Sequence, residues 1–472
     1  MKKVICARPL KSIIRRASCL VACCLLCVGP VATSEGKAED AKLTTELKSM
    51  LGDNGTKVPG LGTIIYVKGK PIYKQFLGSR YIDNTNRKKD LPVTEDTRFR
   101  VASVSKQFTS YTIMQLVEQG KLKLDGDVSD YLGFMLRNPS YPNTPITVRM
   151  LMSHTSSLRD GSIYAIAPQL SVKEFFTPQG QYWEEGKHFA PASEAPGDYF
   201  KYSNLNYGLL GTIIEKITGE RFDLYQKEHI FKDLAIKADY TVGNFTPQEF
   251  KKLGAIYQKN KNGVWQENGP WIAQIDDYQG KQPQADMVYV QNPDHRETDK
   301  WCSLQDYKPG TNATIFSPQG GLRISYRELG HTLEFLLHQG KFRGKQVLSP
   351  QSLQEVMKVH WQYNKDNNNG NTYGGTLENY GLGLFRIVGN STSRVCKNRE
   401  VNLIGHTGEA YGLLSGIFIQ PETQSGFIYM MNGEAVAEDD DPRSAGKFSG
   451  NYIWEENIMN ALTERILAET QK

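Results

Sequence analysis

The sequence predicts one two-lobed domain of α+β or α/β class, in which an antiparallel sheet built from both chain ends is flanked by helices beside a mostly helical lobe. Alternating apolar residues at 62–67 and 72–76 flank a turn with Gly and Pro at 68–71, which indicates an antiparallel hairpin near the start. The middle of the chain has helical periodicity, and strand-like runs return near its end. Both ends therefore supply the sheet, and the helical middle forms the second lobe.

The individual elements follow from the spacing of apolar residues. The first strong helix is expected to begin at Ser103, because apolar residues then recur on one face up to residue 116 and Gly120 provides a stop. Further helices are predicted at 207–218, 222–231, 327–339 and 452–467, and strands at 381–388, 413–420 and 427–432. The stretch 246–314 is rich in Asn, Gln, Asp, Pro and Lys, so we expect a long irregular insertion that could form a wall or lid over a cleft.

The first 34 residues have the order of an export signal. Basic residues extend to Arg16, an apolar stretch covers 17–28, and small residues follow at 32–34. That stretch is too short to span a bilayer comfortably, so we expect a signal peptide over 1–34 and an exported protein, periplasmic or secreted. The alternative is a lipoprotein signal at 20–23, in which a lipidated Cys23 would anchor the protein to a membrane. We predict a linker over 35–57 and one domain over 58–472.

Charge and cysteine usage exclude several classes of protein. The formal charge of +5 belongs to the leader, because the remaining residues carry 50 basic and 51 acidic groups without a basic run. Nucleic-acid phosphates demand clustered Lys and Arg, so no nucleic-acid partner is expected. Only Cys302 and Cys396 lie outside the leader, and either a disulfide or two buried thiols fits them. No residue pattern indicates a metal or another cofactor, or a particular oligomeric state.

Ser103 and Lys106 lie three residues apart at the opening of the first helix, so their side chains share one face. A serine hydroxyl is a poor nucleophile until a neighbouring base takes its proton, and a lysine can do so when burial or nearby charge lowers its pKa. The N-terminal end of a helix also stabilises negative charge on an attacked carbonyl. Taken alone, the pair also fits a capping serine and a solvated lysine.

Two further motifs carry polar groups suited to acyl chemistry. Tyr202 could relay a proton to a leaving group, and Asn204 could hold a substrate carbonyl and orient the lysine. His406, Thr407 and Gly408 precede a predicted strand, whose edge could bind an acyl substrate through backbone hydrogen bonds. Taken alone, the first motif also fits a packed tyrosine with a helix cap, and the second a solvent-facing turn.

The three motifs in this order resemble the serine β-lactamase and penicillin-binding protein superfamily. The resemblance is to the branch that contains class C β-lactamases, D-alanyl-D-alanine carboxypeptidases and family VIII-like esterases. It extends from Gly62 to the C-terminus and includes the segments 99–102, 151–158, 196–197, 320–322 and 380–384. His406 stands where class C β-lactamases usually carry Lys, which is similar to some carboxypeptidases and esterases, and Ser157 replaces a usual Gly.

The resemblance implies a β-lactamase-like serine hydrolase that acts through an acyl-enzyme on an amide, β-lactam or ester carbonyl. Its substrate would be a small molecule or a peptidoglycan peptide. Backbone N–H groups of Ser103 and Glu409 would hold the oxyanion, and Tyr202 would protonate the leaving group. Asn204 and His406 would position the substrate. An esterase of the same fold and a non-hydrolytic penicillin-binding sensor remain as alternatives.

His154 lies beside several serines, which could suggest a Ser-His-Asp triad. The resemblance assigns its segment a structural role, so we expect a histidine buried beneath the site. The sequence around Ser103 also lacks the GxSxG pattern of an α/β-hydrolase.

Overall fold

The computed structural model describes residues 34–292 and 295–471. The predicted signal peptide and the alternative lipidation at Cys23 therefore lie outside the described residues, apart from Ser34. No helix in the described ranges combines the length and the apolar character needed to cross a membrane.

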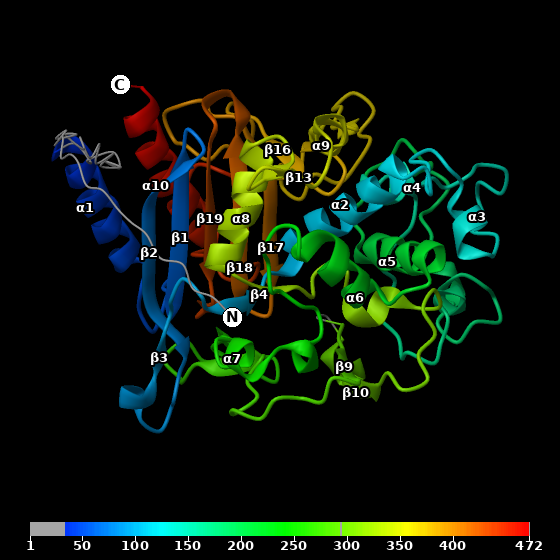
Figure 1. Cartoon of the computed structure of the whole chain (residues 1–472), viewed down its shortest axis with the longest axis horizontal. Helices are drawn as coiled ribbons and strands as arrows, with labels where there is room; N and C mark the ends of the chain where they lie inside the picture. Colours follow the sequence, from blue (N-terminus) through cyan, green and yellow to red (C-terminus); the bar gives the residue numbers. More distant parts are fainter. Residues whose placement is uncertain (1–33, 293–294, 472) are drawn as a thin grey trace, which may run out of the picture.

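The largest sheet has nine strands, and its strands come from both ends of the chain (Figure 1). In sheet order they are β14 (Trp361–Gln362), β15 (Asn379–Tyr380), β16 (Phe385–Ile387), β17 (Leu403–Ala410), β18 (Leu413–Gln420), β19 (Ser425–Met431), β1 (Gly60–Val67), β2 (Lys70–Tyr81) and β3 (Leu91–Pro92). Every neighbouring pair is antiparallel, and β1 joins β19 with Leu61 opposite Met431. The predicted fold class is confirmed.

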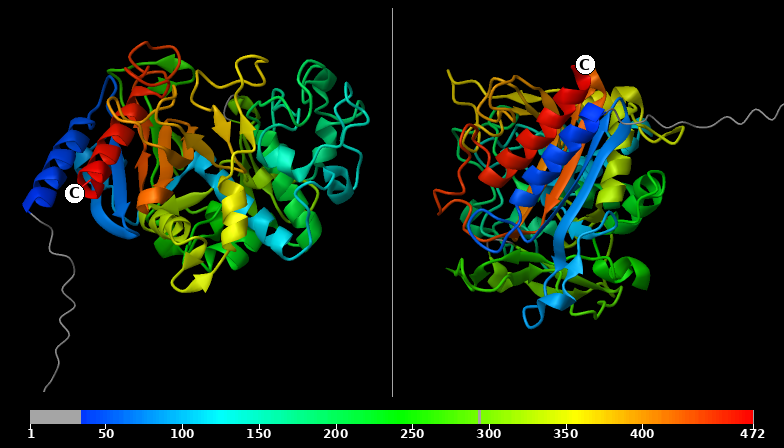
Figure 2. Two further views of the ribbon diagram at one scale, coloured as in Figure 1. Left: turned by 90° about the horizontal axis from the view of Figure 1, so that it is seen from above. Right: turned by 90° about the vertical axis from the view of Figure 1, so that its left-hand side faces the viewer.

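Two helices pack side by side against one face of this sheet, α1 (Ser34–Ser49) and α10 (Ile453–Thr470) (Figure 2). The expected linker over 35–57 is therefore wrong for its first part, which is helical. Leu43 and Leu47, one turn apart, are buried with apolar residues of α10, and Asp40 forms an ion pair with Arg465. A helix with only this narrow apolar stripe resembles a polar linker in sequence.

The opposite face of the sheet is covered by α8 (Tyr326–Leu337), beyond which lies the helical lobe (Figure 1). Its helices are α2 (Ser105–Glu118), α3 (Val128–Leu132), α4 (Val148–Met152), α5 (Asn204–Thr218), α6 (Phe222–Gln226) and α9 (Pro350–Met357). Eleven of the fourteen residues of α2 are buried, so this helix forms the centre of the lobe. Residues 227–231 continue the helix that begins at Phe222, as predicted, but with π-helical hydrogen bonding.

The stretch 246–314 contains more regular structure than its composition predicts. It holds α7 (Pro247–Phe250), β5 (Ile256–Gln258), β6 (Asn260–Lys261), β7 (Val264–Trp265), β8 (Ile272–Ile275), β9 (Met287–Val290) and β10 (Lys300–Ser303). The strand β5 pairs with β20 (Gly433–Glu434), which follows β19, and this attaches the stretch to one end of the large sheet. Strands of two to four residues are too short for alternation to reveal them.

The remaining short strands form two antiparallel pairs. They are β4 (Arg98–Arg100) with β11 (Arg323–Ser325), and β12 (Lys341–Phe342) with β13 (Lys345–Gln346). The first pair carries the chain into the segment that contains Ser103. Cys302 and Cys396 are both buried free thiols, which decides the question that the sequence leaves open.

Candidate active site

Ser103 lies in a single 3₁₀ turn, Ala102–Val104, that connects β4 to α2. The helix therefore starts at Ser105, two residues later than predicted. Ala102 has φ 44°, in the left-handed region that side chains other than Gly rarely adopt. Such backbone strain persists where the surrounding structure enforces it, and here it presents the half-buried Ser103 at the end of the helix.

Lys106 is fully buried and its amine makes three polar contacts. The Nζ atom lies 3.0 Å from Ser103 Oγ, 2.9 Å from Asn204 Oδ1 and 3.1 Å from the carbonyl oxygen of Gln319. The amide and carbonyl oxygens can only accept hydrogen bonds, so each takes one N–H. In its neutral form the amine has only two N–H groups, so its lone pair is then left for the Ser103 hydroxyl.

Burial holds the pKa of Lys106 well below its usual range, and the nearby Arg100 guanidinium lowers that pKa further. The Asp160 carboxylate acts in the opposite direction, but the effect of burial is larger. Aromatic rings surround the amine, with Nζ 4.5 Å from the centroid of Tyr202 and 5.5 Å from that of Tyr207. Burial therefore favours the neutral amine, which is the form of lysine that can accept a proton.

Tyr202 approaches the same centre from the segment that leads into α5. Burial raises the pKa of its phenol well above the usual value, and interaction with Ser103 opposes this rise. The Tyr202 hydroxyl nevertheless makes no hydrogen bond of good geometry to any described residue. It therefore remains a neutral phenol with a proton available to a group that enters the site.

Asn204 is held in one orientation by its two neighbours. Its Oδ1 accepts from Lys106, and its Nδ2 donates to Asp160 Oδ2 at 3.1 Å. Because a carboxylate only accepts, this contact assigns the nitrogen of the Asn204 amide to the Asp160 side. The expected orienting contact between Asn204 and the lysine is present in the structure.

Asp160 is a site residue that the sequence reasoning missed. Besides Asn204, its carboxylate accepts from Ser203 Oγ at 2.8 Å and from the backbone N–H of Leu205 at 2.9 Å. These bonds tie the start of α5 to the loop after α4 and place a negative charge near Lys106. Only a carboxylate following the 151–158 segment hints at this role in the sequence, and no spacing rule connects it to residue 204.

The third predicted motif lies inside β17 and not in a turn before β18. Gly408 packs directly on the nucleophile segment, because a Cβ added there would lie 2.3 Å from the Val101 oxygen and 3.2 Å from the Ser103 nitrogen. Pairing of β16 with β17 ends at Gly405, so the following residues of β17 have an edge that β16 leaves uncovered. Thr407 is half-buried and Glu409 is exposed along this edge.

His406 is buried and points away from the substrate side of β17. Its Nε2 lies 3.0 Å from the Tyr380 hydroxyl, and its Nδ1 donates to the carbonyl of Thr407. Burial and the neighbouring Lys106 lower the pKa of His406 to about 3. Both ring nitrogens are thus engaged inside the protein, and neither is left to contact a substrate as the resemblance implied.

Tyr380 links His406 to His154 in one continuous hydrogen-bond chain. His154 Nδ1 accepts from the backbone N–H of Ser203 at 3.1 Å, so its Nε2 carries the proton and donates to the Tyr380 hydroxyl at 3.2 Å. Tyr380 then donates to His406. Burial also lowers the pKa of His154 well below its usual value. The histidine supports the segment before α5, because its ring nitrogens contact Ser203, Asn206 and Tyr380 and not Ser103, in keeping with its expected structural role.

A cavity of about 320 Å³ opens beside Ser103. Its wall includes residues from β4, β17, the turn after β17 and the 246–314 stretch, among them Arg100, Arg296, Glu409, Tyr411 and Glu438. Gln258 and Arg296 come from that stretch, which therefore forms part of the wall, as the sequence suggested.

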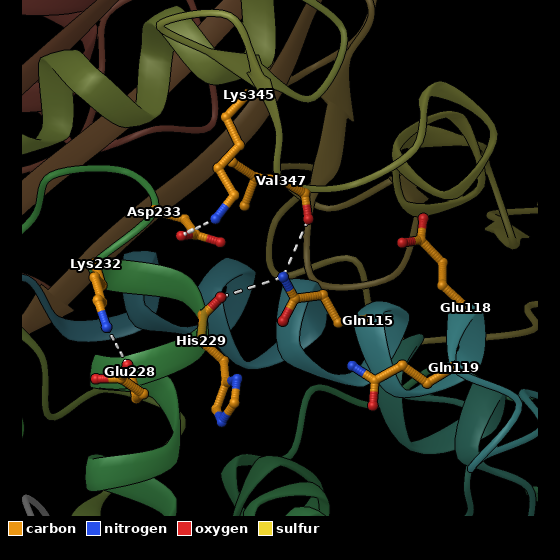
Figure 3. A pocket seen from close by; sticks show the side chains of 9 residues that line it. All are labelled: Gln115, Glu118, Gln119, Glu228, His229, Lys232, Asp233, Lys345 and Val347. Atoms are coloured by element: carbon orange, nitrogen blue, oxygen red, sulfur yellow. Dashed lines mark hydrogen bonds and ion pairs between the residues drawn. The ribbon is translucent and has the colours of Figure 1, made fainter.

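A second cavity, of about 440 Å³, lies on the outer side of α2 (Figure 3). Its charged groups are already paired, Lys232 with Glu228 and Lys345 with Asp233. Gln115 bonds to the backbone oxygens of His229 and Val347. None of the residues that line this cavity is a Ser, Thr or Cys nucleophile, in contrast to the cavity at Ser103.

A profile of the Beta-lactamase family matches residues 45–450, which include every site residue described above. The chain belongs to the Beta-lactamase family. The resemblance drawn from the three sequence motifs is confirmed, and family membership indicates a hydrolase of the serine type.

Two curated relatives of this Beta-lactamase family chain match over shorter regions. It is 27% identical over 183 residues to Protein flp of Staphylococcus aureus (strain MW2), which covers 38% of the chain and 34% of that protein. It is 29% identical over 218 residues to an N-acetylmuramyl-L-alanine amidase of Bacillus subtilis (strain 168), and this region covers 41% of the chain and 45% of the amidase. The chain thus spans less than half the length of these relatives.

Solved structures show the same fold as this family member. The octameric penicillin-binding protein homologue from Pyrococcus abyssi superposes with a TM-score of 0.56 at 21% identity, over 85% of this chain and 74% of that one. The D-amino acid amidase from Ochrobactrum anthropi SV3, complexed with L-phenylalanine amide, superposes with a TM-score of 0.58 at 18% identity. The match covers 92% of this chain and 99% of the amidase.

Proposed function

We propose that the protein is a serine hydrolase that forms an acyl-enzyme at Ser103 with an amide, β-lactam or ester substrate. The observation that carries this proposal is the fully buried amine of Lys106, whose Nζ lies 3.0 Å from Ser103 Oγ. A buried amine loses its hydration, and no carboxylate among the described residues forms an ion pair with Lys106, so its burial brings no evident structural advantage. A buried amine beside a serine hydroxyl is, however, an arrangement that nucleophilic catalysis requires.

Acylation follows from this arrangement. Lys106 accepts the Ser103 proton while Oγ attacks the substrate carbonyl, and the resulting oxyanion is held by the backbone N–H groups of Ser103 and Glu409. The Tyr202 phenol gives its proton to the leaving amine or alkoxide, and the proton on Lys106 returns to the phenolate. The acyl–oxygen bond to Ser103 then remains, with the leaving group released.

Deacylation uses the same groups with water in place of the leaving group. Lys106 is again neutral and can take a proton from a water that attacks the acyl carbonyl. Expulsion of Ser103 Oγ, which regains a proton, frees the acid. The rate of this step decides between a β-lactamase or carboxypeptidase that turns over and a sensor that stays acylated.

The amidase among the curated relatives supports an amide substrate, and we propose a D-alanyl-peptide amide or β-lactam as the first class to test. An esterase of the same fold is the second candidate. It is favoured by the neutral His406, because an uncharged residue at that position leaves the site without the cation that β-lactamases of class C carry there.

Intact-mass measurement with a reporter penicillin tests the proposal. The wild-type chain should gain one acyl adduct, the Ser103→Ala variant none, and a Ser105→Ala control should label as wild type does. Ser105 is buried two residues away and its hydroxyl accepts from the Leu322 backbone N–H, so it controls for loss of a neighbouring serine. Absence of both an adduct and hydrolysis with penicillin, a D-alanyl peptide and a nitrophenyl ester would reject an acyl-enzyme.

A further inference from the structure

One side of the cavity beside Ser103 is cationic. The guanidinium carbons of Arg100 and Arg296 lie over the ring of Tyr411, at 5.1 and 4.8 Å from its centroid. Neither arginine forms an ion pair with a carboxylate in the part of the chain that the structure describes. Burial raises the pKa of the nearby Asp299 to about 6, although the Asn292 backbone N–H and both arginines oppose this rise. The Asp299 Oδ1 accepts from the Asn292 N–H at 2.7 Å and forms no ion pair with either arginine.

Three polar atoms on residues of this cavity are buried without a partner among the described residues. They are Nε of Arg100, Oε1 of Gln319 and the hydroxyl of Tyr411. These side chains are 3%, 4% and 5% exposed, so solvent cannot satisfy them freely. A buried polar group without a partner is costly to the folded state, and the gathering of three such groups beside a nucleophile indicates a site completed by a ligand.

Backbone strain supports the same conclusion for Tyr411. Its φ of 61° is in the left-handed region, at the tight turn between β17 and β18, and Gly412 follows with φ 97°. The turn directs a large side chain at the cavity where Asn or Gly would hold the backbone without strain. Strained residues of this kind concentrate at ligand sites.

Another side of the same cavity is acidic. Glu438 and Glu409 line it, and Glu434 lies buried behind them with neither carboxylate oxygen hydrogen-bonded to a described residue. Burial, and then repulsion from Glu434, raises the pKa of Glu438 well above its usual value, and burial raises that of Glu434 to about 7. A cation bound beside Glu438 would relieve this repulsion.

We propose that this cavity binds the acyl part of the substrate, and that this acyl group carries both a carboxylate and an ammonium group. The inference rests on the proposed acyl-enzyme function and names its substrate class. The carboxylate lies against Arg100 and Arg296 with the Tyr411 hydroxyl donating to it, and the ammonium lies against Glu438. Gln319 Oε1 is a further acceptor for the ammonium or for a substrate N–H.

The location of the cavity favours the acyl part over the leaving group. Glu409 belongs both to the proposed oxyanion site and to the cavity wall. The wall continues through Ala410, the last residue of β17, and Tyr411 in the turn that follows. Tyr202, the proposed acid for the leaving group, does not line the cavity. The substrate carbonyl at Ser103 therefore has its acyl chain on the charged side.

Four p-nitroanilides of matched chain length test the proposal: pentanoyl, 5-aminopentanoyl, glutaryl and γ-glutamyl. In that order, their acyl groups carry no charge, an amine, a carboxylate, and both an amine and a carboxylate. Each charged contact is expected to raise kcat/KM by about tenfold or more over the pentanoyl compound, because hydrogen bonds between charged partners are the strong ones. The γ-glutamyl compound should therefore be the best of the four.

Two variants assign the contacts to residues. In Arg296→Gln, kcat/KM for the glutaryl compound should fall relative to kcat/KM for the pentanoyl compound. In Glu438→Gln, kcat/KM for the 5-aminopentanoyl compound should fall relative to that for the pentanoyl compound. Arg399→Gln is the matched control, because Arg399 is exposed near the C-terminal helix and pairs loosely with Glu464. Ratios of two substrates on one variant cancel any loss of folded protein.

The outcomes separate the two proposals. Ser103-dependent cleavage of all four compounds at similar rates would overturn the zwitterionic acyl site and leave the hydrolase proposal standing. Unchanged ratios in Arg296→Gln and Glu438→Gln would also overturn it. Failure to cleave or become acylated by any of the four, with no penicillin adduct either, would overturn the hydrolase proposal and this inference with it.

Discussion

Replacement of Gly408 by Ala tests whether β17 must touch the nucleophile segment. The added Cβ would lie 2.3 Å from the Val101 oxygen and 2.6 Å from Ser415 Oγ, so β17 must move outward by roughly 1 Å to reach ordinary contact distances. That movement also lengthens the 3.1 Å bond from Ser415 Oγ to Val101 O. Since misplacement by about 1 Å costs on the order of 100-fold in rate, acylation should fall by that factor.

The assay is the second-order rate of adduct formation with the reporter penicillin, measured by stopped quench and intact mass. Gly320→Ala is the matched control, because Gly320 lies on the same cavity but an added Cβ there meets Ala102 at an ordinary 3.6 Å. It should stay within about threefold of wild type, as expected where no atom must move. Circular dichroism checks that both variants are folded. Acylation of folded Gly408→Ala at the parental rate would refute the close-packing argument.

Three further results are expected from the site and the core. The acylation rate should rise with pH and level off well below the pKa of a solvated lysine, because only neutral Lys106 accepts the proton and burial lowers its pKa; a midpoint near 10.4 would contradict this. Asp160→Ala should destabilise the protein by about 2 kcal/mol in urea unfolding, because three hydrogen bonds to α5 and the residue before it are lost. Tyr380→Phe should destabilise it by about 1–3 kcal/mol, because His154 and His406 each lose a hydrogen-bond partner. Unchanged midpoints of the urea unfolding curves would count against these hydrogen-bond networks. Cys302 and Cys396 should react with a thiol reagent only after unfolding, and two accessible thiols in the native chain would show that they are not buried.

Long periodic elements were predictable from the sequence, and short or weakly apolar ones were not. The strand β18 has the predicted bounds, 413–420, because seven of its eight residues are buried and five of the eight are Leu, Ile or Phe. The strand β17 was missed, since Gly405 and Gly408 weaken its β-propensity and its buried histidine appears polar. Its glycines are present because another backbone approaches closely, which only the tertiary structure reveals.

The candidate site likewise has parts that the sequence predicts and parts that it does not. Ser103 and Lys106 could be paired from the sequence because a helix fixes the distance between residues three apart. Asp160 and the carbonyl of Gln319 reach the lysine from loops, and no local rule gives the distance between a loop and a helix far away in the sequence. The engagement of His406 inside the protein likewise depends on Tyr380, a residue of another strand.

The pairing of β1 with β19 has a consequence for when the protein acquires its site. Leu61 and Met431 are neighbours across the sheet although about 370 residues separate them, and β17 is also made late. Folding that depends on such distant pairs is slow, and a ribosome adds only about 5–20 residues each second. The nucleophile segment is synthesised early but has no β17 against which to pack until most of the chain has emerged. A nascent or truncated chain that ends before β17 therefore carries Ser103 and Lys106 without an oxyanion site.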